Sequence, residues 1–314
     1  MFKRNVLLAP YTTFGIGGRA DYFLEVRNPE ELVLAVKLAV KDKMRYEVIA
    51  GGSNVVFSDK TFDGLVIHYR VKKQGSTLKT RQGRTLKCEA GLLLSRLIET
   101  AISNGLAGLE TLSGIPGTVG GAIVGNAGAY GQTISDCLTR VEIFDPKNVR
   151  HSVSHKRWLT KKQCRFAYRE SVFKSKNWLI LRAEFKLKKG DKKVLAKKSR
   201  EIIKVRSEKY NPNLRCPGSF FKNVLISDVS RVTLARIDKQ KIRAGKIPAG
   251  YLLEAVGAKG RRVGGIYVAD FHGNLLINDG HGTYRDVRLL AAKLKKLVQK
   301  KFGIELDEEV RYIN

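Results

Sequence analysis

The sequence predicts an α+β fold in at least two domains, and three observations lead to this prediction. The chain has 314 residues, and a single domain usually takes about 100–200. Hydrophobic residues make up 43% and charged residues 28% of the chain, which is ordinary globular usage and excludes a wholly disordered protein. Segments with the hydrophobic spacing of strands and of helices follow one another along the chain.

The N-terminal part of the chain predicts a strand–helix–strand–strand unit. Its helix begins at Pro29 and runs to Lys41, with Asn28 in position to cap the first turn. The turn at Asp63 and Gly64 precedes the last strand. The strands of this unit are predicted at residues 21–26, 46–50 and 65–69.

The rest of the chain continues this mixture of helices and strands. An amphipathic helix over residues 91–104 ends at Gly105. A long basic helix covers residues 186–209, and a Pro- and Gly-containing break follows it. We place a domain boundary near residue 190. The remaining predicted strands are residues 140–144, 178–186, 266–269 and 275–277, and the remaining helices are residues 251–256 and 286–302.

Net charge is the unusual property of this chain. Lys and Arg number 59 against 29 Asp and Glu, which leaves a formal charge of +30. Such a balance suits nucleic-acid binding. However, basic residues occur throughout the chain, and the densest run, residues 186–209, has the spacing of a helix with a solvated basic face. We find neither aromatic-interleaved basic strands nor a recognition helix, so we expect no specific nucleic-acid partner.

Composition also bears on compartment and metal binding. No apolar run reaches the roughly 20 residues that cross a bilayer, and the N-terminal segment lacks the apolar core of a signal peptide. We therefore expect a soluble, cytoplasmic protein without membrane contact.

The four cysteines are far apart, so we expect free thiols. Only His151 and His155 have helical spacing, among residues typical of a strand or loop, so we expect no metal site.

The first of two glycine-rich segments follows a predicted strand and consists of Gly51, Gly52, Ser53 and Asn54. Glycines there let consecutive backbone N–H groups turn toward one anion such as a diphosphate, with the Ser and Asn side chains as further donors. A plain tight turn is the alternative. Residues 15–20 match a dinucleotide fingerprint only superficially, because a strand follows them where that motif needs a helix.

The second segment holds seven glycines within residues 114–131. In regular structure each glycine is unfavourable by roughly 0.5–1 kcal/mol relative to Ala, so a density this high needs a reason. A flexible linker is one alternative, but Ile115, Val119, Ile123 and Val124 make the segment too apolar for a linker. We favour close approach of the backbone to a flat or extended ligand.

Several short motifs occur in a fixed order along nearly the whole chain. They are residues 12–21 (TTFGIGGRAD), 51–54 (GGSN), 113–122 (SGIPGTVGGA), 126–131 (NAGAYG), 168–171 (YRES), 218–223 (GSFFKN) and 306–311 (LDEEVR). In sequence and order they resemble the UDP-N-acetylenolpyruvoylglucosamine reductase family, the flavoenzymes of peptidoglycan precursor synthesis. Each motif alone is weak, but their common order makes the resemblance specific.

The resemblance implies a p-cresol methylhydroxylase-type FAD-binding domain of two α+β subdomains, followed by an α+β substrate-binding domain. We expect the first domain in residues 1–189, with subdomains of about 1–70 and 71–189, and the second in residues 190–314. The implied reaction has two halves. NADPH reduces FAD, and flavin N5 then delivers hydride to C3 of the enolpyruvyl group of UDP-N-acetylglucosamine enolpyruvate. Protonation at C2 leaves UDP-N-acetylmuramate.

The resemblance assigns catalytic roles to three side chains. Arg169 offers a permanent cation with a planar donor fork to the substrate carboxylate, on which negative charge grows. Glu309 must be protonated to donate toward that charge, and only the motif selects it among the acids at residues 307–309. Ser219 is the proton donor to carbon. A hydroxyl is a poor acid in water and needs a partner, for which we name Lys222 by proximity in sequence.

The resemblance also implies binding residues. The expected FAD contacts are Gly51, Gly52, Ser53, Asn54, Ile115, Pro116, Gly117, Thr118, Gly120, Gly121 and Ala122. The expected substrate contacts are Tyr130, Tyr168, Lys222 and Asn223, with Asn223 near the UDP diphosphate. We expect a monomer whose partners are the nucleotide sugar and NADPH.

Two other functions stay open at this point. One is an oxidase or dehydrogenase with the same flavin fold and another small substrate, although no His or Cys in the glycine-rich loops offers a covalent flavin anchor. The other is a basic nucleic-acid-binding protein without flavin. The chain also departs from the family pattern, because Val224 stands where Pro is usual and residues 227–246 form a longer, basic insertion.

Overall fold

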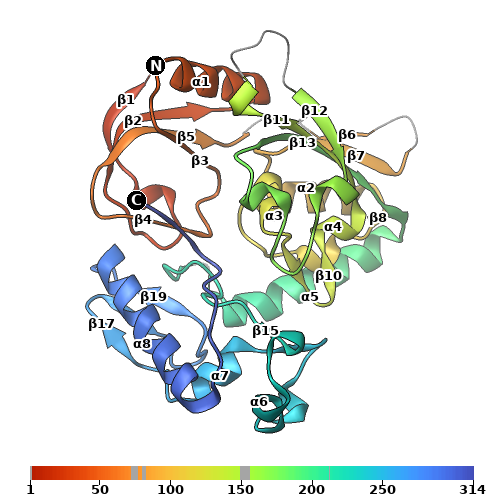
Figure 1. Ribbon diagram of the computed structural model, residues 1–314. Coiled ribbons are helices and arrows are strands. Elements are labelled where there is room, and N and C mark those ends of the chain that lie inside the picture. Colours follow the sequence, from red (N-terminus) through yellow and green to blue (C-terminus); the bar gives the residue numbers. More distant parts are fainter. Residues whose placement is uncertain (1, 72–76, 80–82, 149–155, 212) are drawn as a thin grey trace. The chain divides into compact units, whose positions relative to one another are not determined.

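The computed structural model describes the chain except residues 1, 72–76, 80–82, 149–155 and 212. His151 and His155 therefore lie outside the described residues. The chain forms two compact units, each assembled from separate stretches of sequence (Figure 1). Unit 1 comprises Met1–Val6, Ala20–Gly51 and Asp63–Glu208, and unit 2 comprises Leu7–Arg19, Gly52–Phe62 and Lys209–Asn314.

The first sheet of unit 1 confirms the predicted strand–helix–strand–strand unit and adds an edge strand. Helix α1 (Pro29–Lys41) begins where the Asn28 side chain accepts a hydrogen bond from the Glu31 N–H at 2.8 Å, as an N-cap does. Its buried Leu32 belongs to the same core as Leu65 of the sheet. The strand order is β1 (Lys3–Leu7), β2 (Arg19–Val26), β5 (Phe62–Tyr69) and β3 (Tyr46–Ile49), with β3 parallel to β5.

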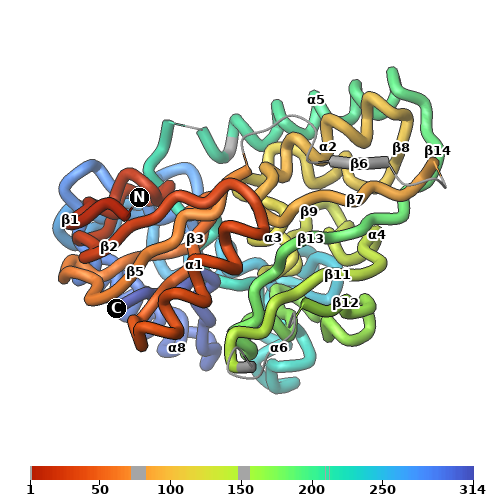
Figure 2. The backbone as a smooth tube through the Cα atoms, turned by 90° about the horizontal axis from the view of Figure 1, so that it is seen from above, coloured from red at the N-terminus to blue at the C-terminus, as the bar shows by residue number. Residues whose placement is uncertain are grey.

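A second, antiparallel sheet completes unit 1, and Figure 2 shows its strands β12, β11, β13 and β7 side by side. Helix α2 (Leu94–Ser103) buries Leu97 in the same cluster that contains Leu65 of the first sheet and Leu181 of the second. Each sheet is confined to one predicted subdomain, but the two sheets share one hydrophobic core. The strands are β12 (Lys156–Thr160), β11 (Leu138–Phe144), β13 (Leu179–Lys186), β7 (Thr85–Glu89) and β6 (Thr77–Lys79).

Helix α5 (Lys192–Lys209) belongs almost wholly to unit 1, whereas the predicted domain boundary precedes it. Two side-chain contacts hold the helix there. Lys198 Nζ lies 2.9 Å from Glu110 Oε1, and the Ser199 hydroxyl lies 2.8 Å from the Ser113 hydroxyl. Because these contacts join α5 to the segment before the glycine-rich stretch, unit 1 ends after this helix.

Unit 2 is built around a small antiparallel sheet and helix α8 (Tyr284–Phe302). The helix starts with a capping box, in which the Thr283 side chain accepts from the Asp286 N–H and the Asp286 carboxylate accepts from the Thr283 N–H. It ends at Gly303, whose φ of 70° is the usual left-handed stop. Its buried Leu290 packs in the core of unit 2. The other elements here are β17 (Arg262–Val263), β18 (Ile266–Val268), β19 (Leu276–Asn278) and α7 (Ala249–Ala255).

The predicted insertion, residues 227–246, is an ordered part of unit 2. Strand β15 (Val224–Leu225) pairs with β16 (Lys246–Ile247) and closes its base. Within it, Ile237 is only 3% exposed and packs in the core of the unit. Residues 227–246 are therefore a folded segment that packs against the core of unit 2 through Ile237.

The remaining elements are short. Strand β20 (Arg311–Ile313) pairs in parallel with β4 (Val55–Phe57) in unit 2. Among the residues that the structure describes, no helix is long and apolar enough to cross a membrane. The other short elements are β8 (Leu106–Ala107), β14 (Lys188–Lys189), β9 (Gly128–Ala129), β10 (Gln132–Thr133), α3 (Val119–Val124), α4 (Ile134–Cys137) and α6 (Arg231–Ala235), with 3-10 turns at Ala9–Tyr11, Glu110–Leu112, Pro146–Asn148, Lys162–Cys164, Val172–Lys174, Ile226–Asp228 and Lys239–Lys241.

Candidate active site

The two predicted cofactor-binding loops meet in unit 1 at Gly51 and Gly117. A Cβ atom on Gly51 would lie 2.7 Å from the Cα atom of Gly117, so a side chain there would force the loops apart. The following segment is held by its backbone, because the Val119 N–H donates to the Leu92 carbonyl at 2.8 Å. Thr118 caps α3 by accepting from the backbone. The backbones of the two loops are therefore in close contact at Gly51 and Gly117.

The rest of the first loop lies in unit 2 and is equally constrained. Gly52 has a φ of +60°, and a Cβ atom there would lie 1.9 Å from the Tyr11 carbonyl oxygen, so only glycine fits. The Thr13 N–H donates to the Gly52 carbonyl at 3.1 Å. Asn54 donates from Nδ2 to the Glu309 carbonyl at 3.0 Å. A predicted cofactor-binding residue thus contacts the backbone of the predicted catalytic acid.

The chemical groups of these loops suit FAD. Gly51 and Gly52 carry no side chain, so a ligand beside them meets main-chain atoms, which is how glycine-rich loops hold a diphosphate. Ser53 and Thr118 bring hydroxyl groups to the same two segments, and neither segment, 51–54 or 113–122, contains Lys or Arg. The backbone groups of these segments and the Ser53 hydroxyl therefore fit the cofactor, whereas the buried Thr118 hydroxyl caps α3.

Two loops of unit 1 that carry predicted substrate residues are tied together by hydrogen bonds. Asn126 donates from Nδ2 to the Ala167 carbonyl at 2.8 Å. Arg169 donates from Nη1 to the Gly128 carbonyl at 3.3 Å. The Ser171 hydroxyl donates to the carbonyl of Val124 at 2.7 Å. The NAGAYG and YRES motifs, about forty residues apart in sequence, are thus adjacent in space.

Backbone strain gathers in the same two loops. Tyr130 has a φ of 52° and Arg169 a φ of 55°, although side chains other than Gly, Asn and Asp rarely adopt this region. Tyr130 and Gly131, with a φ of 80°, form the turn between β9 and β10, and the tyrosine is 56% exposed. Such strain is found most often where function requires a particular side-chain direction. The strained positions are residues that the sequence motifs also single out.

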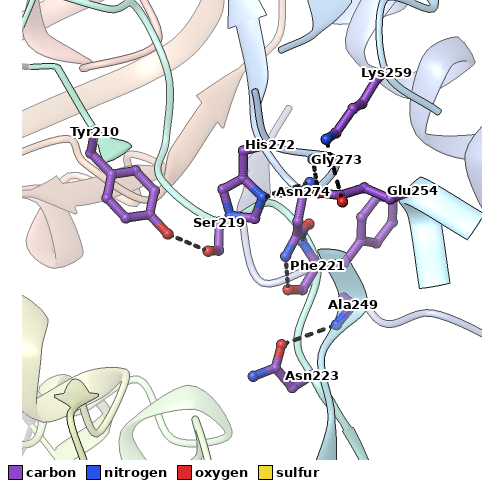
Figure 3. Close-up of polar contacts among 10 residues, drawn as sticks. All are labelled: Tyr210, Ser219, Phe221, Asn223, Ala249, Glu254, Lys259, His272, Gly273 and Asn274. Carbon is purple, nitrogen blue, oxygen red and sulfur yellow. Dashed lines mark hydrogen bonds and ion pairs between the residues drawn. The ribbon is translucent and has the colours of Figure 1, made fainter. Parts of the chain in front are cut away.

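In unit 2, Ser219 lies in an extended segment held on one edge by the turn that precedes β19 (Figure 3). Ser219 pairs with Leu275 in an antiparallel bridge, and the Phe220 N–H donates to the Asn274 carbonyl at 3.0 Å. The buried Asn274 side chain continues this pairing with two hydrogen bonds to the next residue. It accepts from the Phe221 N–H at 2.8 Å and donates to the Phe221 carbonyl at 2.9 Å. The backbone that carries Ser219 is therefore fixed.

The other edge of this segment pairs with the acidic motif near the end of the chain. The Glu309 N–H donates to the Phe220 carbonyl, and the Lys222 N–H donates to the Asp307 carbonyl, both at 2.8 Å. Three of the predicted site residues of unit 2, Ser219, Lys222 and Glu309, are thereby brought onto neighbouring strands. The sequence motifs alone could not show this pairing.

The three acidic residues at positions 307–309 differ in their contacts and burial. Glu308 lies 4.0 Å from Lys295 Nζ on α8, and burial together with the neighbouring Glu308 raises the pKa of Tyr312 well above its usual range. Asp307 is exposed. Glu309 is half-buried, and its backbone N–H and carbonyl are both hydrogen-bonded within unit 2. The choice of Glu309 among the three acids stays a prediction from the motif.

The Ser219 hydroxyl has a partner that sequence reasoning missed. Tyr210 Oη lies 3.0 Å from Ser219 Oγ, whereas the partner expected from proximity in sequence is Lys222. Tyr210 stands nine residues earlier in the sequence, and no motif includes it. Asn223, an expected substrate contact, accepts from the Ala249 N–H at 3.1 Å and so holds the start of α7.

Comparison with known protein families places both parts of the chain. Residues 20–153 match the FAD binding domain family. Residues 208–313 match the C-terminal domain family of UDP-N-acetylenolpyruvoylglucosamine reductase. The order of the two matches is the order predicted from the sequence.

Full-length relatives agree with these matches. UDP-N-acetylenolpyruvoylglucosamine reductase of Solibacter usitatus is 44% identical over 98% of this chain and 95% of its own length. The protein of the same name from Carboxydothermus hydrogenoformans is 37% identical over 98% of this chain and 93% of its own length. The crystal structure of UDP-N-acetylenolpyruvylglucosamine reductase from Thermus caldophilus has a TM-score of 0.75 and 30% identity, with each chain covered completely. The predicted α+β flavoenzyme fold is confirmed.

Proposed function

The chain belongs to the UDP-N-acetylenolpyruvoylglucosamine reductase family, and from this premise we propose which of its residues carry the reaction. The enzyme reduces the enolpyruvyl group of UDP-N-acetylglucosamine enolpyruvate to give UDP-N-acetylmuramate, with FAD as cofactor and NADPH as electron donor. Similarity along the whole chain favours this reaction over that of another flavin oxidase. The observation that supports the catalytic assignment most directly is the pairing of the Ser219 segment with the segment that carries Glu309.

The protein's own tasks follow from the chemistry of the cofactor. When bound, FAD is reduced by NADPH and supplies a hydride from N5 to C3 of the enolpyruvyl group. Main-chain atoms of residues 51–54 and 115–122 hold the cofactor. The side chains must then bind the substrate, stabilise the negative charge that develops on its carboxylate, and deliver one proton to C2.

Ser219 delivers the proton to C2. Its segment is fixed on both edges by backbone hydrogen bonds, so the main chain that carries the hydroxyl is already in place while the charge develops. A proton donor that is already in place loses no free energy to reorganisation during the reaction. The Oγ atom also has a hydrogen-bond partner, which a weakly acidic hydroxyl needs.

Arg169 and Glu309 stabilise the charge on the substrate carboxylate. The Arg169 guanidinium is a permanent cation with several donors in one plane, which suits a carboxylate, and its contact with the Gly128 carbonyl directs the side chain. Glu309, in its protonated form, donates a hydrogen bond toward the same charge. Hydrogen bonds of this kind strengthen as charge develops and so lower the barrier.

The remaining proposed contacts concern binding and partners. The expected substrate contacts are Tyr130, Tyr168, Lys222 and Asn223. The nucleotide sugar and NADPH are polyanions, and the chain, with its net charge of +30, attracts them. We place the enzyme in the cytoplasm, as a monomer without a specific nucleic-acid partner.

Replacement of Ser219 by alanine tests the proposal. The Ser219→Ala variant should reduce its flavin with NADPH at the wild-type rate. Reoxidation of that flavin by the enolpyruvyl substrate should be slower by about 10²–10⁴-fold, the usual contribution of a positioned general acid. Rapid mixing with flavin absorbance at about 450 nm would measure both halves separately.

The matched control is Ser207→Ala, which removes an exposed hydroxyl from α5 and should change neither rate. If Ser219→Ala reoxidises its flavin as fast as the wild type, Ser219 is not the proton donor. If the wild-type enzyme shows no reoxidation that depends on the enolpyruvyl substrate, the proposed reaction itself is wrong.

A further inference from the structure

The proposed proton donor shares a hydrogen bond with a second hydroxyl group. Tyr210 Oη and Ser219 Oγ are 3.0 Å apart, and Figure 3 shows the two side chains pointing toward each other. Tyr210 is half-buried, so that it is neither cut off from water nor fully solvated. Its ring packs against the small apolar cluster that contains Leu275, the backbone partner of Ser219.

We propose that Tyr210 relays a proton to Ser219 in each turnover. This inference rests on the proposed role of Ser219. As the C–H bond forms at C2 of the substrate, the O–H bond of Ser219 breaks. In the same step the O–H bond of Tyr210 breaks and its proton restores the serine hydroxyl. The tyrosine oxygen afterwards takes a proton from water. The net change is one proton moved from water to C2.

Acidity explains why a tyrosine is useful at this place. A phenol is a much stronger acid than an aliphatic alcohol, so it gives up a proton to a serine oxygen more readily than water does. Without the phenol, the serine oxygen would carry most of the charge at the moment of proton transfer. Sharing that charge across the hydrogen bond between the two oxygens lowers the free energy of the transition state.

One turn of unit 2 fixes both hydroxyl groups. The Tyr210 ring lies edge-on to the His272 ring, with 6.2 Å between ring centroids. The Asn274 N–H donates to Nδ1 of that histidine at 3.4 Å, and the Asn274 carbonyl accepts from the Phe220 N–H beside Ser219. The tyrosine ring and the serine backbone therefore rest on the same residues, so the distance between their oxygen atoms is built into the fold.

The turn at residues 272–274 is itself held to α7 by Glu254. Glu254 Oε1 accepts from the Gly273 N–H at 3.0 Å, and Lys259 Nζ lies 3.3 Å from the same carboxylate. Burial opposes ionisation of Glu254, but the hydrogen bonds from Gly273 and Lys259 outweigh it and lower the pKa of this carboxyl group. The ionised carboxylate thus holds the turn in place. Tyr210 is a positioning residue, because it acts on the substrate only through Ser219.

The Tyr210→Phe variant removes the hydroxyl and keeps the ring that packs against His272. Its flavin should be reduced by NADPH at the wild-type rate, and reoxidation by the enolpyruvyl substrate should be slower by about tenfold or more. This loss can be smaller than the roughly 10²–10⁴-fold of a direct proton donor, because Ser219 keeps its own hydroxyl. Binding of the substrate to the oxidised enzyme, measured by the change in flavin absorbance, should be unchanged within about twofold. Wild-type reoxidation in this variant would overturn the relay.

A double variant separates a relay from an independent effect. If Tyr210 acts only through Ser219, Ser219→Ala with Tyr210→Phe should reoxidise its flavin no more slowly than Ser219→Ala alone. A further slowing by the full single-variant factor would overturn the proposal. A Ser219→Ala variant that reoxidises normally would instead overturn the role of the serine, so the two failures are distinguishable.

Two further measurements guard against a purely structural explanation. Tyr267→Phe is the matched control, since Tyr267 packs against the same apolar cluster, and it should leave both half-reactions unchanged. In mixtures of H₂O and D₂O, the reoxidation rate of the wild-type enzyme should depend on the deuterium fraction in a curved manner, because two protons move together. A linear dependence, which one moving proton gives, would overturn the relay without any variant.

Discussion

Individual residues of the site are held in conformations that their side chains alone would not choose. Tyr130 and Arg169 both lie in the left-handed region, which is unfavourable by about 1–3 kcal/mol for each such residue. The hydrogen bonds that tie their loops together at Ala167 and Gly128 offset this strain. The motifs identified both residues, but nothing in the sequence pattern indicated their backbone conformation.

Substitution of Tyr130 by asparagine should separate stability from function. Asparagine tolerates a positive φ and is common before glycine in such turns, so Tyr130→Asn should raise the free energy of unfolding by about 1 kcal/mol. The KM for the nucleotide sugar should rise, because the proposed contact is lost. Urea denaturation and steady-state kinetics would measure the two effects. Tyr130→Phe, which keeps the strain, should not be stabilised; equal stability of all three proteins would contradict this account.

The partner of Ser219 shows where prediction from the sequence ends at this scale. Lys222 is named as a partner of Ser219 because it is near in sequence, and its role stays a prediction. The Tyr210 hydroxyl lies beside Ser219, and its ring packs edge-on to that of His272, more than sixty residues later in the chain. A hydrogen bond of this kind depends on tertiary structure, and no local pattern encodes it.

Among the elements, α5 shows how a few side chains decide which unit a helix joins. Its hydrophobic spacing predicts the helix itself, because the 3.6-residue period is a local property. Its assignment to unit 1 depends on Glu110 and Ser113, residues more than eighty positions earlier. The sequence alone therefore could not show that the compact unit extends to Glu208, beyond the predicted boundary near residue 190. The parallel pairing of β4 with β20 could not be predicted from local patterns either, because the two strands are far apart in sequence.

The Glu110→Gln variant should weaken the attachment of α5 in a pH-dependent manner. Burial opposes ionisation of Glu110, but the Gly108 N–H and Lys198 lower its pKa below 4.5. A lowered pKa adds stability above pH 4.5 that is lost as the pH falls through the folded value. At pH 7 the variant should be less stable by about 1–2 kcal/mol, a modest figure because Lys198 is half-exposed.

Thermal unfolding between pH 3 and pH 7 would measure this difference. The stability gap between the wild type and Glu110→Gln should shrink below pH 4.5. Glu201→Gln, on the exposed side of the same helix, should show little change at any pH. A gap that stays constant down to pH 3 would mean that the charge of Glu110 is not what holds the helix.

For the whole molecule, the dominant property is the net charge of +30. The described acidic residues are largely in ion pairs or hydrogen bonds with the fold, as Glu30, Glu110, Glu184 and Glu254 are. The basic excess therefore remains on the surface. A field of this sign increases the encounter rate with anionic substrates and is screened by salt.

The catalytic efficiency with NADPH should consequently depend on ionic strength. Between about 0.01 M and 0.1 M salt, the screening length falls from about 30 Å to about 10 Å, and kcat/KM should fall severalfold. The kcat at saturating NADPH and nucleotide sugar should change little, because the field acts on encounter. Steady-state assays over this range, with sucrose at matched osmolality as control, would measure both. A kcat/KM that is independent of salt would contradict a role for the charge.

The pairing of β20 with β4 has a consequence for biosynthesis. The loop that carries Gly52, Ser53 and Asn54 is synthesised early, but its partners come from residues 309–313. Asn54 donates to the Glu309 carbonyl and accepts from the Arg311 N–H at 3.0 Å. These hydrogen bonds can form only after more than 250 further residues have been translated. The first of the two proposed cofactor-binding loops is therefore completed only once translation has passed residue 311.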